Sequence, residues 1–245
     1  MTDETNNLSL YNKVKTTDPK YTKAYSLGGG DSGTSVPGQY FILKATDIFG
    51  PIGIGWGYEI QEDRFDEGGP FIYNNETFRE LTHTIKLRLW YKLDDKQGES
   101  VQYGHTRYVY LTSGGKVKTD NEYAKKSLTD AIKKCLVNLG FAGDIYLGLH
   151  DDPNYVAATR ADFAVEDAVD KVAEQAEQAE KLRDEMANNM SCMDKALSEN
   201  ELKGVFKIAW KTAEARNSEE WKQTLKDCYD LNKERLNPKQ NAVNS

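Results

Sequence analysis

Three lysines in the segment 124–140 (AKKSLTDAIKKCLVNLG) have the type and spacing to hold a phosphate backbone. If the segment is a helix, Lys126, Lys133 and Lys134 fall on one side of it, with Asp130 among them. The predicted buried face consists of Ala124, Leu128, Ala131, Ile132, Cys135 and Leu139. A row of lysines on a rigid helix suits contact with phosphates. It equally suits an ordinary solvent-exposed face, which is the favoured interpretation of the helix alone.

A second group of cations surrounds a tryptophan on a predicted strand. In THTIKLRLWYKL (82–93) apolar and polar side chains alternate, so that one face is core and the other is polar. The polar face carries Lys86, Arg88, Trp90 and Lys92. Cations can follow a phosphate backbone, and an aromatic ring offers a stacking surface worth about 1–3 kcal/mol per base. The alternative is a plain solvent face in which another element covers the tryptophan.

The segments around these residues predict an α+β fold. A helix within 37–50 is expected to end at Gly50, and the predicted strands that follow are 56–62, 82–93 and 100–111. The third strand can carry Tyr103, His105 and Arg107 on one face. Thr119 and Glu122 have capping-box spacing and mark the start of the lysine helix. This order indicates an antiparallel sheet of three to four strands, a β-β-β-α core packed by helices.

Changes in composition divide the chain into five parts. We expect a flexible N-terminus over 1–20, a core domain over 21–157 and an acidic linker helix over 158–190. A small α-helical C-terminal domain follows over 191–237, and 238–245 is expected to be a flexible tail.

The helical part of the chain has two different characters. Residues 161–189 lack glycine and proline and predict one highly charged helix with only a thin stripe of small apolar residues. Such a stripe buries little, which favours a linker or a weak self-association helix. Residues 198–216 and 218–235 predict a helical hairpin, and Ser198 and Glu201 have capping-box spacing at its start.

Composition limits the classes of function. The 245 residues carry a net charge of −7, but 162–185 alone holds 9 acidic and 3 basic residues, so the rest of the chain is close to neutral. No run approaches the roughly 20 apolar residues of a membrane span, and the N-terminus does not resemble a signal peptide. Cys135, Cys192 and Cys228 are far apart and lack metal-ligand spacing. We expect a cytoplasmic protein.

Two further patterns carry less weight. Gly28, Gly30 and Gly33 satisfy GxGxxG, but no buried strand precedes them, so a turn is favoured over a dinucleotide-binding loop. His150-Asp151-Asp152 could belong to a metal-dependent nuclease, but the histidines lack ligand spacing and the two aspartates precede a proline, as in a turn.

Four segments resemble, in order, the Rad-fifty-two-type single-strand annealing proteins. TDAIKKCLVNLGFAGDIYLG (129–148) is similar to the family's signature helix and the turn that follows it. YTKAYSLGGG (21–30) resembles a basic residue followed by a glycine run. ATDIFGPIGIGWGYEI (45–60) resembles a helix ending in Phe-Gly before a tryptophan-bearing strand, and the hairpin 82–111 takes the place of the central sheet. The resemblance covers roughly 21–152 and is nearest to small phage-encoded recombination proteins.

The resemblance implies roles for particular residues. Lys133 and Lys134 match the basic pair that contacts the DNA backbone in the family's inner groove, and Lys23 is a looser match to the residue before the glycine run. Val137 departs from the pattern, because a further basic residue is expected there. The family assembles as rings or helical oligomers, so the resemblance implies that the core over 21–157 binds and anneals DNA and oligomerises. The tail 194–236 resembles in a general way the helical domains with which phage recombinases recruit partners.

The sequence therefore predicts a non-enzymatic protein that binds single-stranded DNA and anneals complementary strands without ATP or another cofactor, in recombination or repair. The predicted DNA-binding residues are Lys133, Lys134, Lys126, Lys23, Lys86, Arg88, Trp90, Lys92 and Arg107. The expected partners are single-stranded DNA, further copies of the chain, and a host single-strand-binding protein or a phage exonuclease at the C-terminal domain. The alternatives are an adaptor or inhibitor of a host DNA enzyme, acting through 162–185, and a metal-dependent nuclease.

Overall fold

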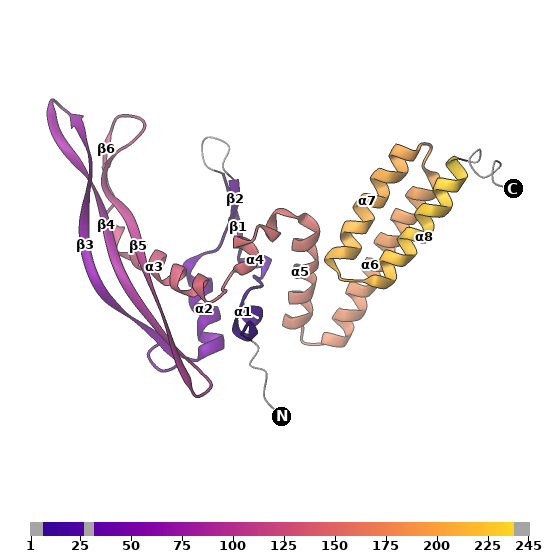
Figure 1. Cartoon of the computed structure of the whole chain (residues 1–245), viewed down its shortest axis with the longest axis horizontal. Coiled ribbons are helices and arrows are strands. Elements are labelled where there is room, and N and C mark those ends of the chain that lie inside the picture. The colour runs from indigo at the N-terminus through magenta and orange to yellow at the C-terminus, as the bar shows by residue number, and fades with distance from the viewer. Residues whose placement is uncertain (1–6, 27–31, 238–245) are drawn as a thin grey trace. The chain divides into compact units, whose positions relative to one another are not determined.

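The computed structural model describes residues 7–26 and 32–237 and divides into two compact units. The first unit contains the chain up to Thr17 together with Tyr21–Leu147. The second contains Asp18–Lys20 together with the chain from Gly148 onward. Strands and helices of the first unit and helices of the second give an α+β fold, as predicted (Figure 1).

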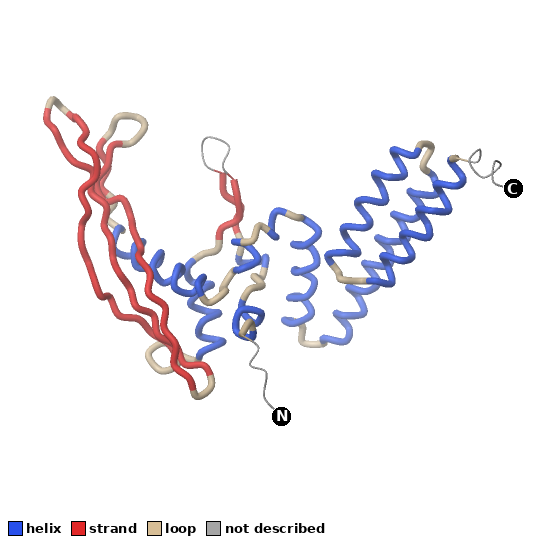
Figure 2. The backbone as a smooth tube through the Cα atoms, viewed as in Figure 1, coloured by secondary structure: helices blue, strands red, loops and turns tan. Residues whose placement is uncertain are grey.

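An antiparallel four-stranded sheet forms the centre of the first unit (Figure 2). Its strands, in spatial order, are β3 (Trp56–Tyr73), β4 (Glu76–Leu93), β5 (Lys96–Leu111) and β6 (Val117–Thr119). The three predicted strands are confirmed, although β3 continues well beyond its predicted end. Apart from the buried Phe71, its extension is mostly exposed and lacks alternation. Asn74 and Asn75 close the β3–β4 hairpin with positive φ angles of 52° and 63°. Two such residues match the twist of a two-residue hairpin turn.

Helix α3 (Tyr123–Asn138) packs against one face of this sheet (Figure 2). On β4 the buried residues alternate as Ile85, Leu87 and Leu89, and they share a core with Ala131, Ile132, Cys135 and Leu136 of α3. The helix comes very close to β5 at Gly104. A Cβ atom at that position would lie 2.1 Å from the Ser127 carbonyl oxygen and 2.6 Å from the Ala131 nitrogen. Only glycine allows this approach.

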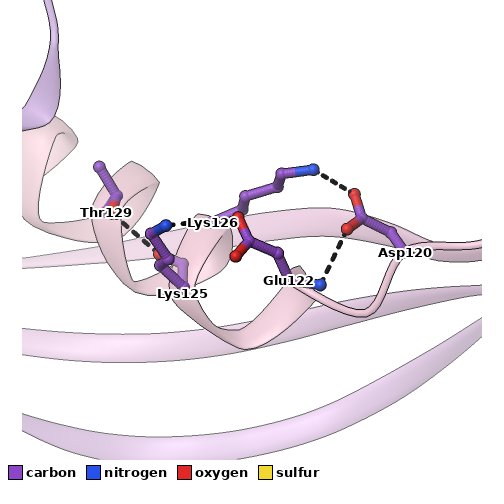
Figure 3. A network of polar contacts seen from close by, with 5 residues as sticks. All are labelled: Asp120, Glu122, Lys125, Lys126 and Thr129. Carbon is purple, nitrogen blue, oxygen red and sulfur yellow. Dashed lines mark hydrogen bonds and ion pairs between the residues drawn. The ribbon is translucent and has the colours of Figure 1, made fainter.

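The start of α3 differs from its prediction. The capping box of Thr119 and Glu122 is wrong, because Glu122 is the N-cap residue and its side chain makes no cap hydrogen bond. Instead, Asp120 Oδ1 accepts the Glu122 backbone N–H at 3.0 Å (Figure 3). Ala124, predicted to be buried, is exposed, and Ser127 takes its place in the interior.

Helix α2 (Gly38–Phe49) packs beside α3 and ends at Gly50, as predicted. Gly50 has a φ of 95°, a conformation that favours glycine at a helix end. Before α2 lies a small antiparallel hairpin of β1 (Lys23–Ser26) and β2 (Ser32–Ser35).

The described N-terminal residues are packed, so the prediction of a flexible segment does not hold for residues 7–20. Helix α1 (Ser9–Val14) buries Val14 completely. Thr17 donates from its backbone N–H and its hydroxyl to the Asp144 carboxylate, at 2.7 and 2.8 Å. Asp144 belongs to the short helix α4 (Gly143–Tyr146) and is 2% exposed. These contacts tie α4 to the start of the chain, and the polar composition of 1–20 gave no sign of them.

The second unit is helical, and its elements are α5 (Pro153–Asp167), α6 (Lys171–Lys195), α7 (Glu199–Ala215) and α8 (Glu219–Leu236). Short 3-10 turns occupy Pro19–Tyr21 and Leu149–Asp151. The prediction of one continuous acidic helix is wrong. Ala168 adopts an extended conformation, and Asp170 caps a new helix by accepting from the backbone N–H groups of Val172 and Ala173.

Helices α6, α7 and α8 share a hydrophobic core, so α6 is more than a linker. The fully buried residues of this core include Met186 and Met193 of α6, Leu202 of α7 and Leu225 of α8. The predicted hairpin of α7 and α8 is confirmed, and Ser198 caps α7 as expected. Across residues 7–26 and 32–237, no helix has the length and apolar character needed to cross a membrane.

The contact at Gly104 yields a test of the packing. We expect Gly104→Ala to lower the free energy of unfolding by about 1–3 kcal/mol, because backbone atoms of α3 occupy the space that the methyl group needs. Urea denaturation measures the change. Gly69→Ala is the matched control, since its Cβ would meet no atom within 4 Å. Equal stability of the two variants would contradict the close packing of α3 on β5.

Candidate nucleic-acid interface

An open cleft of about 220 Å³ lies along the polar side of α3. Its lining residues are Gln102 of β5, Asp130, Lys133, Lys134, Val137 and Asn138 of α3, and Tyr146 of α4. The cleft thus combines two ammonium groups with two amides, a carboxylate and a phenol. The structure brings the two lysines of the predicted basic pair together in it. Val137, where a further cation was expected, also lines the cleft.

Lys134 is the more accessible of the two lysines. Its side chain is 39% exposed, and its Nζ lies 2.7 Å from Asp130 Oδ2 and 3.3 Å from His105 Nε2. Asp130 Oδ2 also accepts the backbone N–H of His105 at 3.1 Å. Asp130 therefore orients Lys134 and anchors α3 to β5, while its charge offsets that of the lysine.

Lys133 has a structural role in addition to its place in the cleft. Its Nζ donates to the Val36 carbonyl oxygen at 3.0 Å and lies 5.4 Å from the centre of the Phe41 ring. Burial lowers the pKa of Lys133, and the nearby charge of Asp130 opposes this effect. The ammonium group thus braces α3 against the segment that leads into α2.

Two tyrosines near the cleft were not identified from the sequence. Tyr146 is 62% exposed. Burial of its hydroxyl is the main cause that raises the pKa of Tyr146, and the charges of Asp130 and Tyr25 raise it further. Tyr25 is exposed on β1, two residues after Lys23, so both side chains project from the same face of that strand. Lys23, which is also exposed, therefore lies on the face of β1 that carries Tyr25.

The cations of β4 lie on the opposite face of the sheet from α3. Lys86 and Arg88 alternate with the buried residues that contact α3, so their side chains point away from that helix. Within one chain Lys86 and Arg88 therefore do not share a surface with Lys133 and Lys134. Strand alternation shows which residues share a face, but it does not show which face a later helix covers.

These cations are also neutralised by carboxylates of neighbouring strands. Arg88 forms ion pairs with Glu59 at 3.2 Å and with Glu99 at 2.7 Å, and Lys86 pairs with Glu62 at 3.4 Å. The hydrogen bond that Arg88 donates to Glu99 is the largest of several contributions that raise the pKa of Arg88. The face carries interleaved charges rather than a basic stripe.

The remaining predicted residues are scattered. The Trp90 ring lies against Gly57, where a Cβ would come within 2.8 Å of it, so one side of the ring is covered. Lys92 is exposed near the β4–β5 turn, opposite Gln97. Arg107 bonds to Glu80 at 2.6 Å.

Lys126 pairs with a local carboxylate and does not line the cleft. Its ammonium group pairs with Asp120 in the segment before α3, while the neighbouring Lys125 pairs with Glu122 (Figure 3). The hydrogen bond that Lys126 donates to Asp120 is the largest of several contributions that raise the pKa of Lys126. Lys126 therefore stabilises the start of the helix, and it does not line the cleft.

A polar chain, buried at His83 and Ser127 and exposed at Asp63, fixes α3 on the sheet. His83 Nδ1 lies 3.0 Å from Ser127 Oγ, and His83 Nε2 lies 2.9 Å from Asp63 Oδ1. The order Asp-His-Ser is that of a nucleophilic triad, but Ser127 is fully buried and no substrate can reach it. The chain instead connects β3, β4 and α3 through their side chains.

The residues of the nuclease alternative do not assemble a metal site in the described parts of the chain, where no group of three His, Cys, Asp or Glu residues is placed to hold an ion. Asp152 is the N-cap of α5 and accepts the Asn154 backbone N–H at 2.9 Å. His150 is buried beside Tyr155. Of the GxGxxG pattern, Gly28 and Gly30 lie outside the described residues, and Gly33 lies in β2.

Comparison with protein-family models gives no match to the chain, and comparison with curated proteins gives none either.

The two lysines of the cleft are predicted to differ in their effect on stability. Lys133→Ala should lower the free energy of unfolding by about 1–2 kcal/mol, because it removes a charged donor from a half-buried backbone carbonyl. Lys134→Ala should change it by about 0.5 kcal/mol or less, since an exposed pair four residues apart on a helix contributes little. Chemical denaturation of both variants decides this. If both cost the same, Lys133 does not brace the helix.

Proposed function

We propose that the chain binds single-stranded DNA at the α3 cleft and anneals complementary strands without ATP. The observation that carries the proposal is the cleft itself, in which Lys134 is accessible beside the amides Gln102 and Asn138 on rigid elements. The ordered resemblance of four sequence segments to single-strand annealing proteins supports it. Lysine and amide side chains donate hydrogen bonds to phosphate oxygens. Such contacts do not depend on the base sequence of the strand.

In this proposal the cleft holds the sugar–phosphate backbone, and the bases remain available for pairing. Base pairing and stacking release free energy, roughly 1.4 kcal/mol per step of duplex, so annealing needs no nucleotide hydrolysis. One cleft contacts only a few nucleotides. We therefore propose that several copies of the chain assemble as a ring or helical filament and present their clefts in succession.

The helical unit supports a further part of the proposal, the recruitment of a partner. Helices α6, α7 and α8 have a core of their own, while Ile208 and Leu231 are 62% and 68% exposed on α7 and α8. We propose a host single-strand-binding protein or a phage exonuclease as the partner. A pull-down with each candidate tests this, with Ile208→Asp as the variant expected to lose the contact.

The annealing function can be tested with two complementary oligonucleotides in the absence of nucleotide and metal. We expect annealing by the wild-type chain and at least about a fivefold weaker affinity for single strands in Lys134→Ala, because one phosphate contact is lost. The log–log slope of affinity against salt should become less negative by about 0.7. Fluorescence anisotropy and strand-pairing assays measure both.

The control for this test removes a cation–carboxylate pair on the other face of the sheet. Arg88→Gln together with Glu99→Gln leaves the net charge unchanged and should not alter binding. Loss of binding in this double variant, with normal binding by Lys134→Ala, would move the site to the sheet. Absence of any retention by the wild-type chain at low salt would refute the proposed function.

A substitution of Asp130 is expected to strengthen the binding of single strands. Asp130→Asn should bind single strands more tightly at low salt, because Lys134 loses its carboxylate partner and the asparagine oxygen can still accept the His105 N–H. An increase of about threefold or more is expected, together with a salt slope that is steeper by about 0.7. Asp95→Asn, in the exposed β4–β5 turn, makes the same change in net charge and serves as the control. Equal effects would show that only total charge matters.

A further inference from the structure

We propose that Tyr146 is the base-contacting residue of the α3 cleft, a platform on which one nucleobase of the bound strand stacks. This inference rests on the proposed function and adds to it a contact with the base beside the contacts with the phosphates. The substrate class it identifies is a strand with exposed bases, so neither a paired duplex nor a phosphate polymer without bases would satisfy the whole site.

The first support is the combination of exposure and location. Tyr146 is 62% exposed and lines the same cleft as Lys134 and Asn138. An aromatic ring beside a cation is the arrangement by which proteins bind single strands without sequence preference, because every base has a π-face. The ring would take the base while the lysine takes an adjacent phosphate.

The second support is the rigidity of the short helix that carries the ring. Asp144, two residues earlier, is buried and accepts two hydrogen bonds from Thr17. A Cβ at Gly143 would lie 2.7 Å from the Tyr11 hydroxyl, so α4 is packed tightly against α1. A ring on a fixed backbone loses little conformational entropy when a base stacks on it.

The third support is the electrostatic character of the phenol. Burial of the hydroxyl, reinforced by Asp130 and Tyr25, raises the pKa of Tyr146. A phenol with its ordinary pKa of about 10 is already protonated at neutral pH, and the upward shift keeps it neutral at more alkaline pH as well. A phenolate would repel the neighbouring phosphates, whereas the neutral ring does not.

Other exposed aromatic residues are less suitable for this role. Trp90 lies on the opposite face of the sheet with one side of its ring against Gly57. The Tyr103 ring, on that same opposite face, already has Lys86 Nζ 5.9 Å and Arg64 Cζ 5.7 Å from its centre. Tyr146 alone among the exposed aromatics of the described residues lines the cleft.

A competing explanation is that Tyr146 belongs to an apolar surface for self-association. The next residue, Leu147, is 66% exposed. Exposed apolar side chains often pack against one another where two subunits meet. The two explanations differ in what they predict for a strand that has no bases.

The experiment compares two oligonucleotides of equal length, a thymidine strand and the same strand with abasic tetrahydrofuran units, by fluorescence anisotropy with the full chain. We expect the wild type to bind the thymidine strand about fivefold or more tightly. Tyr146→Ala should lower affinity for the thymidine strand to that for the abasic strand and leave the abasic affinity unchanged. Tyr146→Phe should retain the difference, and Tyr103→Ala is the matched control on the other face of the sheet.

The outcomes separate the inference from the function on which it rests. Failure of the wild type to bind either strand refutes the proposed function. Equal binding of both strands by the wild type, or a preference that survives Tyr146→Ala, overturns the role of Tyr146 and leaves phosphate binding intact. Weaker binding of both strands by Tyr146→Ala, together with a smaller assembly in sedimentation, also overturns it in favour of self-association.

A second measurement covers the case in which Tyr146→Ala fails to fold. Wild-type protein is irradiated with a strand that contains 5-iodouracil, and the cross-linked peptide is identified by mass spectrometry. Cross-linking at Tyr146 supports stacking, because the halogenated base reacts with an aromatic ring in contact with it. Cross-links confined to other residues contradict it.

Discussion

The close approach of α3 to β5 at Gly104 is the constraint on which the rest of the first unit depends. The helix backbone rests almost directly on the strand, because glycine leaves no Cβ between the Ser127 carbonyl and the sheet. At this separation Cys135 Sγ reaches the Ser100 carbonyl oxygen at 3.4 Å, and Ser127 reaches His83. Because α3 lies this close to β5, Gln102 of β5 lines the cleft on the outer side of α3. The core and the candidate site are therefore two sides of one packing arrangement.

Within this arrangement, the partner of each cation decides what the cation can do. Arg88 sits between Glu59 and Glu99, Lys126 is held by Asp120, and Lys133 donates to a backbone carbonyl. Lys134 lines an open cleft, and among the described residues it has a single carboxylate partner, Asp130. Net charge says little about such a site, because screened charges act only over about 8–10 Å. Local pairing matters more than the overall value of −7.

The sequence predicted elements with a clear period and missed what depends on contacts between elements. The alternation in 82–93 and the helical spacing in 198–216 correspond to β4 and α7, because each pattern records which side of a single element is buried. The face of the sheet that α3 covers, the glutamates opposite Arg88, and the approach of Tyr146 to Lys134 all require tertiary structure. Ala168 and Asp170 show a local failure as well. Asp170 interrupts an otherwise helical composition because its side chain caps a new helix. In the sequence this N-cap could not be distinguished from the many other acidic residues nearby.

The pairing of Lys134 with Asp130 has a consequence for the proposed annealing function. A phosphate that binds Lys134 must compete with a carboxylate 2.7 Å away, so each contact gains less free energy than an unpaired lysine would supply. A protein that anneals strands benefits from this weakness. Two strands find their register by repeated sampling, and a strand held too tightly at each nucleotide exchanges too slowly to do so. Many weak and equivalent contacts along an assembly can retain a strand while each one opens readily, because total affinity rises with the number of contacts while each individual contact stays weak. Under the proposed function, Asp130 would set the strength of each phosphate contact, and repetition of the cleft along the proposed assembly would restore the affinity that Asp130 removes.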